Sequence, residues 1–298
     1  MTVPPWTHEA SGDGRLDISE AEFKRFQELI HRTAGIWLSA EKQPLLIARL
    51  WSRMRELGLR SFNEYHRRVV ADGDAELIKV LDAVTTNETS FFRDQRHFEF
   101  LQEKVLPLWA TRPRSRRIRV WCAGCSTGEE PYSLAMALHH RLPRSAGWDV
   151  RILATDISNQ ALERARSGIF PMTKRSQIPE RYLKKYMLRG RGSHEGEMAV
   201  MDEVRAMVQF ARHNLVDEIW PLHKTVDLLF CRNVLIYFSR ESREYTSKRL
   251  ASRVAPGGYL FLGHAESLRG MGIDLDPTIP AVYTRANGAR SLKGVQTQ

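Results

Sequence analysis

An apolar run, a glycine loop and an acidic helix start follow one another in residues 118–138, IRVWCAGCSTGEEPYSLAMAL. Ile118, Val120 and Trp121 predict a short buried strand, and residues 132–138 place apolar side chains at helical spacing, with Pro131 as the expected helix start. Glycines in such a turn let a ligand approach the backbone at the helix N-terminus, as in doubly wound α/β sheets that bind nucleotide-like molecules. The stretch therefore predicts an α/β fold with a ligand site at this turn.

The acids at the helix start indicate which ligand the turn would bind. Glu129 and Glu130 disfavour a pyrophosphate, which requires a helix N-terminus without negative side chains. The spacing from Gly124 to Gly128 is GxxxG, whereas a dinucleotide fingerprint is GxGxxG. S-adenosylmethionine carries an ammonium and a sulfonium and fits better. The next predicted strand, DVRILATD, ends in Asp156, where a carboxylate can accept hydrogen bonds from both ribose hydroxyls.

The CxxC sequence at residues 122–125 offers two competing interpretations. A redox CxxC lowers its thiol pKa by lying on the first helical turn, but here Cys122 is expected on the strand and the nearby acids would raise that pKa. A zinc site would need more well-spaced ligands than this pair and the distant Cys231. Both interpretations rank below cofactor binding, and no metal site is expected.

Composition indicates an ordinary globular chain of 298 residues, long enough for two domains, with 42% hydrophobic residues and three cysteines. The N-terminus has no signal-peptide pattern and no apolar run is long enough to span a bilayer, so we expect a cytoplasmic protein without membrane insertion. The formal charge of +10 favours an anionic partner, either a nucleic acid or an acidic protein surface.

Residues 1–16 are expected to form a disordered lead and residues 17–85 an N-terminal helical domain. Its first helix begins at a capping box, Ser19 with Glu22. Its second helix, residues 44–57, carries Arg49, Arg53 and Arg55, which could be plain solvated surface or could pair with a Glu-rich partner helix. The segment TTNETSFFR, residues 85–93, follows, and its polar residues could equally be a capped helix start.

Residues 86–285 are expected to form the α/β domain, with an insertion at about residues 171–212 and a flexible tail at 286–298. The insertion contains a helix, a glycine-rich turn and alternating segments around residues 198–201 and 204–210, which predict a β-hairpin or small antiparallel subdomain. Residues 226–230 read as a central parallel strand that ends in Cys231, Arg232 and Asn233. Strand ends at this edge of the sheet form the ligand crevice.

Taken together, these segments closely resemble the CheR-type chemotaxis receptor methyltransferases over residues 23–284. The resemblance rests on TTNETSFFR at 85–93, STGEEPYS at 126–133, ATDIS at 154–158, RSGIF at 166–170, FCRNVLIYF at 230–238 and GHAES at 263–267. It implies an all-α N-terminal domain, a doubly wound, Rossmann-like methyltransferase domain and a small antiparallel β-subdomain inserted in it. It also implies methyl transfer from S-adenosylmethionine to receptor glutamates, with S-adenosylhomocysteine as the product.

The resemblance also implies roles for individual residues. Residues of the linker, the acidic helix start and the strand ends would bind the cofactor: Asn87, Thr89, Arg93, Glu130, Asp156, Asn214, Leu215, Cys231, Arg232 and Asn233. Glu130 would face the methionine ammonium, although Glu129 is not excluded in its place. Because a glutamate is already ionised at neutral pH, no strong base is required, and Arg93 and Tyr237 would hold the carboxylate as the catalytic residues.

The expected partner is the cytoplasmic domain of a chemoreceptor. Arg49, Arg53 and Arg55 would meet its acidic methylation helix. The loop LRGRGSHEG at 188–196, with Gly190 and Gly192, is of the type that docks a C-terminal pentapeptide by strand addition. We expect a monomer without nucleic-acid binding. A nucleic-acid methyltransferase and a non-catalytic adaptor are the alternatives, and residues 231–234 lack the Pro-Pro-aromatic strand end usual for amino-methylation of a flipped adenine.

Overall fold

The computed structural model describes residues 17–111, 116–222 and 224–287. The chain divides into two compact units, residues 1–85 and 86–298. The expected disordered lead, residues 1–16, lies outside the described residues, as do residues 288–298 of the expected flexible tail.

The first unit is helical, with α1 (Glu20–Ala34), α2 (Gln43–Glu56), α3 (Phe62–Asp72), α4 (Asp74–Val84) and a 3-10 turn, η1 (Ala40–Lys42). The predicted capping box is present, because the Ser19 side chain accepts from the Glu22 backbone and the Glu22 side chain accepts from the Ser19 backbone. Phe26, Leu50 and Tyr65 are fully buried and form the centre of this small core. The all-α N-terminal domain is therefore confirmed.

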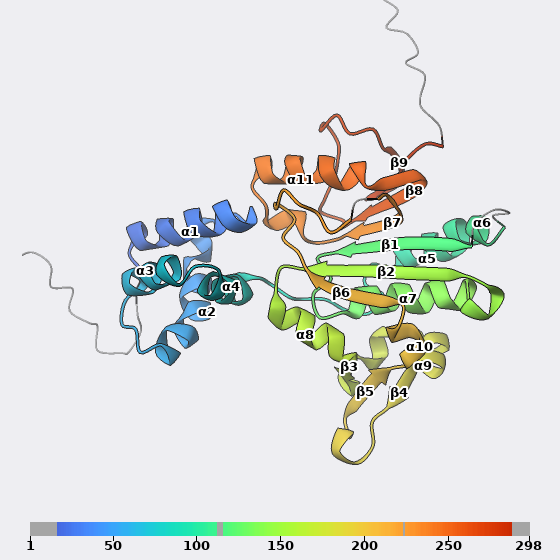
Figure 1. Ribbon diagram of the computed structural model, residues 1–298, viewed down its shortest axis with the longest axis horizontal. Helices are drawn as coiled ribbons and strands as arrows, with labels where there is room; N and C mark the ends of the chain where they lie inside the picture. Colours follow the sequence, from blue (N-terminus) through green and yellow to red (C-terminus); the bar gives the residue numbers. More distant parts are fainter. Residues whose placement is uncertain (1–16, 112–115, 223, 288–298) are drawn as a thin grey trace, which may run out of the picture. The chain divides into compact units, whose positions relative to one another are not determined.

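The second unit is built on a seven-stranded sheet in the order β6-β2-β1-β7-β8-β10-β9. Its strands are β1 (Arg117–Ala123), β2 (Asp149–Asp156), β6 (Val208–Arg212), β7 (Val226–Cys231), β8 (Val254–Leu262), β9 (Asp276–Ile279) and β10 (Val282–Thr284). The first five are mutually parallel, whereas β10 runs antiparallel to both β8 and β9. Figure 1 shows the arrowheads of β1 and β2 pointing the same way. The chain leaves β1 toward β2 on one side and returns to β7 on the other, which is the switch point of a doubly wound sheet.

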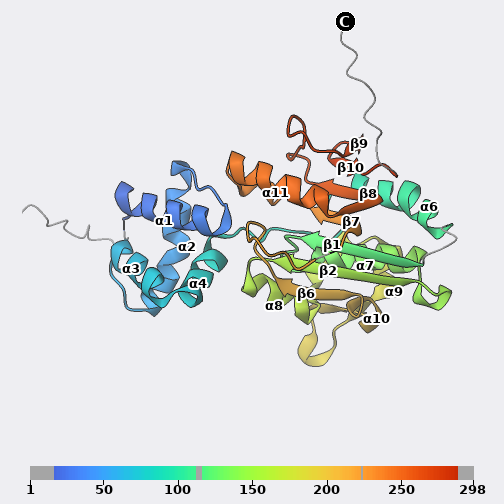
Figure 2. The same cartoon turned by 45° about the horizontal axis from the view of Figure 1, so that its top comes forward.

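Helices connect the parallel strands and pack against the sheet. Helix α7 (Glu129–Arg141) follows β1, α8 (Asn159–Ser167) follows β2, and α11 (Arg240–Ser252) precedes β8, with the 3-10 turn η3 (Arg144–Ala146) before β2. Turning the view in Figure 2 keeps α11 beside β8 and α8 beside β6. The expected helix start at Pro131 was wrong by two residues, because Gly128 takes the N-cap position with φ 99° and both acids enter the first turn.

One long helical run precedes β1, consisting of α5 (Gln95–Phe100), a π-helical turn η2 (Leu101–Val105) and α6 (Leu106–Ala110). Phe91 and Phe92, just before it, are both buried within the second unit. The Phe92 ring stacks on Tyr182 at 4.9 Å, and Phe91 meets Phe170 edge-on at 4.8 Å. These contacts tie the TTNETSFFR segment to the body of the α/β unit.

A second sheet, in the order β3-β5-β4, is antiparallel and consists of β3 (Ile169–Pro171), β4 (Met187–Arg189) and β5 (Glu197–Val200). It is accompanied by η4 (Met172–Gln177), α9 (Glu180–Tyr186), η5 (Gly192–His194) and α10 (Asp202–Arg205), and it projects beyond β6 in Figure 1. The inserted antiparallel subdomain is thus present. Its expected segment at 204–210 was wrong, because Val204 lies in α10 and residues 208–212 pair with β2 in the large sheet. Alternation alone does not distinguish the edge strand of one sheet from a strand of another.

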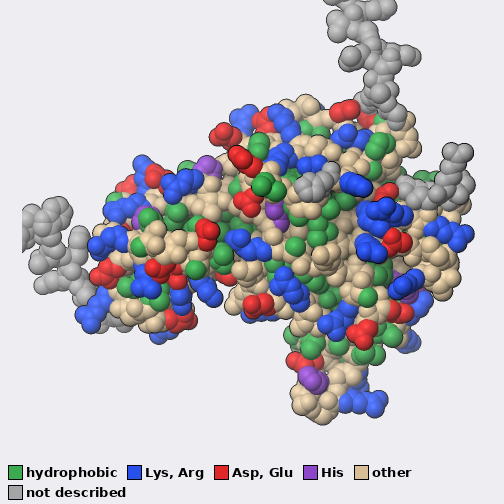
Figure 3. Space-filling view, in the orientation of Figure 1, with side chains coloured by type: hydrophobic (Ala, Val, Ile, Leu, Met, Phe, Trp, Pro, Cys, Tyr) green, Lys and Arg blue, Asp and Glu red, His purple; other side chains and the backbone are tan. Residues whose placement is uncertain are grey.

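Three further properties of the described residues bear on function. None of their helices is both long enough and apolar enough to cross a bilayer. No group of three or more His, Cys, Asp or Glu side chains among them is arranged to hold a metal ion. On the face shown in Figure 3, Lys and Arg side chains are spread over both units with Asp and Glu among them.

Candidate functional site

The expected cofactor residues come together where the parallel strands end. Ala123, Asp156, Arg212 and Cys231 are the last residues of β1, β2, β6 and β7. The register pairs Ala123 with Thr155, and Asp156 with Arg212, so these ends lie at the same edge of the sheet. The loops that follow them carry most of the predicted site residues, in the crevice position typical of this fold.

Asp156 fixes the glycine loop to the end of β2. Its Oδ2 accepts a hydrogen bond from the Ser126 backbone at 2.7 Å, and its Oδ1 accepts one from the Ser158 backbone at 2.9 Å. The cap of α8 is Ser158, whose side chain accepts from the Ala161 backbone. Asp156 is therefore no helix cap, and its buried carboxylate joins two of the loops that border the crevice.

Gly128 has no room for a side chain. A Cβ there would lie 3.0 Å from the Ala165 Cα of α8, and its φ of 99° is in the region that favours glycine. The close approach of loop and helix keeps the N-terminal turn of α7 against the strand ends.

Glu130 lies in a row of charges that also contains the buried Arg232 and the half-buried Asp94. Its Oε2 is 3.1 Å from Nη1 of Arg232, and its Oε1 accepts from the Cys122 thiol at 2.9 Å. Arg232 donates in turn to the Asp94 carboxylate and, at 2.6 Å, to the Arg93 carbonyl. Burial raises the pKa of Glu130, with the Arg232 charge opposing it. Burial would also raise the pKa of Asp94, but the hydrogen bond and charge of Arg232 outweigh it and hold that pKa below its usual range.

Glu129 has different partners from Glu130. It is fully buried, pairs with Lys174 of η4 and accepts from the Thr127 hydroxyl at 2.6 Å. It therefore ties the inserted subdomain to the start of α7. Of the two acids, Glu130 is the one that lies in the row of charges at the strand ends.

The linker residues Asn87, Thr89 and Arg93 are all half-buried. The Asn87 carbonyl accepts from the Ser126 hydroxyl at 2.9 Å, so the linker runs along the glycine loop. The Arg93 guanidinium donates to the Glu88 carbonyl at 3.2 Å. Through Arg232 and Ser126, the structure thus brings the linker to the same edge of the sheet as Glu130 and Asp156.

Asn214 and Leu215 follow β6 and are both buried. The Asn214 side chain donates to Asp217 at 3.0 Å, and Trp220 in the same loop packs on Trp121 at 5.0 Å. At the end of β7, Cys231 is buried. Asn233 then adopts φ 59° and leads into the 3-10 turn η6 (Leu235–Tyr237), which contains the half-buried Tyr237.

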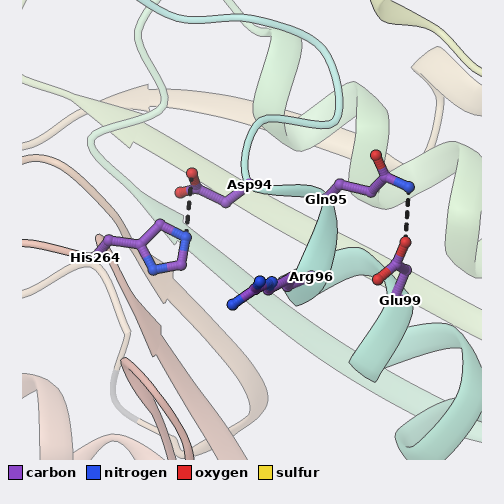
Figure 4. A pocket seen from close by; sticks show the side chains of 5 residues that line it. All are labelled: Asp94, Gln95, Arg96, Glu99 and His264. Atoms are coloured by element: carbon purple, nitrogen blue, oxygen red, sulfur yellow. Dashed lines mark hydrogen bonds and ion pairs between the residues drawn. The ribbon is translucent and has the colours of Figure 1, made fainter.

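An open hollow of about 360 Å³ lies on the outer side of the row of charges, lined by Asp94, Gln95, Arg96, Glu99 and His264. Figure 4 shows His264 facing Asp94, at 3.4 Å, and Gln95 bonded to Glu99 at 2.7 Å. His264 is half-exposed and faces a carboxylate that also pairs with Arg232. A structural role for His264 accounts for this geometry.

All three cysteines are buried and none forms a disulfide, and Cys122 lies on β1 as predicted. Burial raises the pKa of the Cys122 thiol, and the charge of Glu130 raises it further. Burial likewise raises the pKa of Cys125. Thiols of this kind are poor nucleophiles, so the geometry gives no support to a redox CxxC.

Two of the three arginines predicted to bind a receptor have internal partners. Arg49 donates to the Val84 and Thr85 carbonyls at 2.5 and 3.0 Å. Arg53 makes a two-point contact with the buried Glu76, at 2.8 and 2.7 Å, and this hydrogen bond lowers the pKa of Glu76. Arg55 is exposed and lies over the Trp51 ring. In the inserted subdomain, Gly190 and Gly192 lie in the loop between β4 and β5, and a Cβ at Gly190 would meet the His194 carbonyl.

Sequence reasoning missed three residues of this site. Asp94 and Lys174 pair with Arg232 and Glu129, and pairings between distant segments leave no trace in local patterns. Glu266 accepts hydrogen bonds from four backbone N–H groups around the end of β7. In the sequence, the only indication that Glu266 matters is its place in GHAES, one of the segments that carry the family resemblance.

The residues at this edge fit a cationic nucleoside cofactor such as S-adenosylmethionine. Asp94 and Glu130 place two carboxyl groups beside the single guanidinium of Arg232, and this excess of acidic groups favours an ammonium or sulfonium over a phosphate. Nε of Arg232 and Oδ1 of Asn233 are buried without a hydrogen-bond partner in the described chain. Buried polar atoms are normally satisfied, so this corner is completed by a bound molecule or by water.

Two family models match the chain. The model described as "CheR methyltransferase, all-alpha domain" matches residues 21–85, and the one described as "CheR methyltransferase, SAM binding domain" matches residues 87–278. The chemotaxis protein methyltransferase of Borreliella burgdorferi is 37% identical over 276 residues, which cover 91% of this chain and 96% of that protein. Those of Salmonella typhimurium and Escherichia coli are each 38% identical over 255 residues, which cover 85% of this chain and 86% of each relative.

Proposed function

The chain belongs to the CheR methyltransferase family and is an S-adenosylmethionine-dependent chemotaxis protein methyltransferase, and on this premise we propose that it methylates glutamate side chains of chemotaxis receptors. The products would be glutamate methyl esters and S-adenosylhomocysteine. The observation that carries the proposal is the meeting at one sheet edge of the glycine loop, Asp156, the Glu130 row of charges and the Arg93 linker.

In this proposal, residues of the sheet edge hold the cofactor. Asp156 accepts hydrogen bonds from the ribose hydroxyls and Glu130 pairs with the methionine ammonium, while Asn214 and Leu215 border the adenine. Asn87, Thr89 and Arg93 close the site from the linker, and Cys231, Arg232 and Asn233 close it from β7. The bound cofactor supplies an electrophilic methyl group, and its transfer to a carboxylate cancels one positive and one negative charge, which a dry site favours.

Arg93 and Tyr237 are the proposed catalytic residues. A glutamate carboxylate is ionised at neutral pH, so the protein needs to orient an oxygen toward the methyl group and not to remove a proton. The Arg93 guanidinium is suited to grip the carboxylate, and the Tyr237 hydroxyl to donate a hydrogen bond beside it. Cys122 and Cys125 have no part in this chemistry, because their thiols are held protonated by burial.

Two surfaces are proposed to meet the receptor. Arg55 is the exposed cation of α2, which also carries Arg49 and Arg53, and this helix would face the acidic methylation helix. The strand β4 is at one edge of the small sheet, next to the loop with Gly190 and Gly192, and would accept a C-terminal pentapeptide as an added strand. These partner roles follow from the family and from the exposure of the two elements.

The direct test is methyl transfer from labelled S-adenosylmethionine to membranes that carry chemoreceptors. We expect label that base releases as methanol, as for a glutamyl ester. Asp156→Ala should raise the KM for the cofactor about 10- to 100-fold, the worth of hydrogen bonds to a charged group. Arg93→Ala should lower kcat on the order of 100-fold by misplacing the carboxylate.

Asp149→Ala is the matched control, because Asp149 begins the same strand that Asp156 ends and pairs with the exposed Arg151. It should leave both constants unchanged. Cofactor binding without any labelled receptor would instead favour an adaptor or a different substrate.

A further inference from the structure

Glu266 is a buried carboxylate to which the chemistry proposed above assigns no role. It follows the end of β8 and is 5% exposed. Its Oε2 accepts from the backbones of Asn233 and Gly263 at 3.0 and 2.6 Å, and its Oε1 accepts from those of Val234 and Ile236 at 2.9 and 3.2 Å. Within the described chain, no Lys, Arg or His makes an ion pair with it. The hydrogen bonds that the described chain donates to this carboxylate all come from backbone N–H groups.

These hydrogen bonds bend the chain after β7 around the carboxylate. Asn233 takes the left-handed conformation, with φ 59°, and the next residues form the 3-10 turn of η6, closed by the Tyr237 backbone donating to the Val234 carbonyl at 3.1 Å. The segment 233–237 begins at a proposed cofactor residue and ends at a proposed catalytic one. The positions of both depend on the same anion.

The arrangement has little room for change. A Cβ on Gly263 would lie 2.8 Å from the Asn233 backbone nitrogen and 2.9 Å from Glu266 Oε2. A carboxylate offers acceptor sites on both oxygens, whereas a glutamine amide offers one acceptor oxygen and turns N–H groups toward the other donors. Hydrogen bonds to an ionised acceptor are also about twice as strong as neutral ones. Replacing Glu266 with glutamine should therefore release the segment without changing the volume of the side chain.

We propose that Glu266 is a positioning residue for methyl transfer, whose carboxylate sets the backbone of residues 233–237 and so places Asn233 at the cofactor and Tyr237 at the substrate carboxylate. The inference rests on the proposed function, since it presumes the roles of these two residues. It assigns Glu266 no contact with cofactor or substrate.

Two double-mutant cycles on the full chain test the proposal. In the first, kcat for receptor methylation is measured for Glu266→Gln, Tyr237→Phe and the double variant. In the second, the Kd for S-adenosylhomocysteine is measured by calorimetry for Glu266→Gln, Asn233→Ala and the double variant. We expect Glu266→Gln to lower kcat roughly 10- to 100-fold, as a displacement near 1 Å would do. In each cycle, the double variant should have about the same kcat or Kd as the more impaired of its two single variants, because the effects of residues that act as a unit are not additive.

Asp227→Asn is the matched control, because Asp227 lies near the opposite end of β7 and its carboxylate also accepts a backbone hydrogen bond, from Arg119 at 2.9 Å. It should leave kcat and Kd unchanged at a temperature where all variants are folded. Gly263→Ala would disturb the same contact between Glu266 and the Asn233 backbone by adding a methyl group, and it keeps the carboxylate. If Glu266→Gln does not fold, Gly263→Ala takes its place in both cycles, with the same expected non-additivity.

Effects that multiply in both cycles would overturn the proposal and leave Glu266 as a purely structural residue. A wild-type protein that binds S-adenosylhomocysteine but transfers no base-labile label to receptors would refute the proposed function instead. In that case the Kd cycle with Asn233→Ala still decides whether Glu266 positions the cofactor end of the segment.

Discussion

Among single residues, Arg232 has the most to lose by substitution. Its side chain is 1% exposed and lies between the carboxylates of Glu130 and Asp94. Arg232→Met would leave both carboxylates without their buried cation, and breaking such a pair typically costs about 3–5 kcal/mol. We expect a loss of this size in the free energy of unfolding, measured with urea at pH 7. The double variant with Glu130→Gln should recover part of it.

The same variant has a predictable pH dependence. Burial already raises the pKa of Glu130, and removing the Arg232 charge would raise it further. The folded variant would then bind a proton on Glu130 where the unfolded chain does not, so its stability falls as pH rises through that window and recovers as pH falls. The stability difference from wild type should shrink between pH 7 and pH 5. A constant difference would mean that Glu130 is not the group left uncompensated.

Positions of single residues were predictable from sequence only where local order determines them. Asp156 was placed by its position at a strand end, and Cys122 by the apolar run in which it lies. Arg53 was interpreted as one of three cations on a basic helix, but its guanidinium binds Glu76, which is 23 residues further along the chain. Such a pairing depends on tertiary packing, which a basic face on one helix does not specify.

Among the elements, the turn from β1 to α7 depends on a backbone conformation that favours glycine. Gly128→Ala would force a side chain into φ 99° and to 3.0 Å from the α8 backbone. Strained conformations of this kind cost about 1–3 kcal/mol, so we expect that loss in stability together with weaker binding of S-adenosylhomocysteine. Gly272→Ala is the control, because φ there is 63° with no neighbour within 4 Å. If the two substitutions weaken binding of S-adenosylhomocysteine equally, the turn at Gly128 has no specific role in the cofactor site.

The edge strand β4 permits an equally specific test of peptide docking. The Gly190 backbone donates to Glu197 of β5, so by alternation the Arg189 N–H points to the open edge. Arg189→Pro would remove that outward donor while keeping the bonds to β5, and it should lower the affinity for a receptor C-terminal peptide about tenfold, the worth of one or two hydrogen bonds. Anisotropy of a labelled peptide measures this. Arg189→Ala separates loss of the guanidinium from loss of the N–H.

Elements were most predictable where their pattern was long. The strand, turn and helix of residues 118–138 and the capping box of α1 were confirmed, because each follows from spacing within one segment. The segment 204–210 was not, because its alternation is shared by the inserted sheet and by β6. Which sheet takes a short strand is decided by long-range pairing.

For the whole molecule, the formal charge of +10 is a property that no single contact explains. On the face shown in Figure 3, Lys and Arg are spread with acids among them, and the excess of basic side chains creates a field that acts at a distance. An acidic receptor helix would be attracted before docking, which speeds association more than it tightens the complex. We therefore expect the net charge to affect the association rate constant more than the affinity.

We expect the association rate constant for the receptor cytoplasmic domain to fall at least about tenfold between 20 mM and 500 mM salt, because the screening length shortens over this range. Stopped-flow measurement checks this. Arg55→Glu and Lys248→Glu change the net charge equally, and Lys248 is an exposed cation of α11 in the second unit. A larger loss for Arg55→Glu would assign the receptor contact to α2. Equal losses would mean that only the net charge, and not α2 in particular, affects the association rate. A rate constant that does not change with salt would argue against electrostatic steering. Arg53 is unsuitable for this comparison, because its removal uncovers the buried Glu76 and destabilises the first unit.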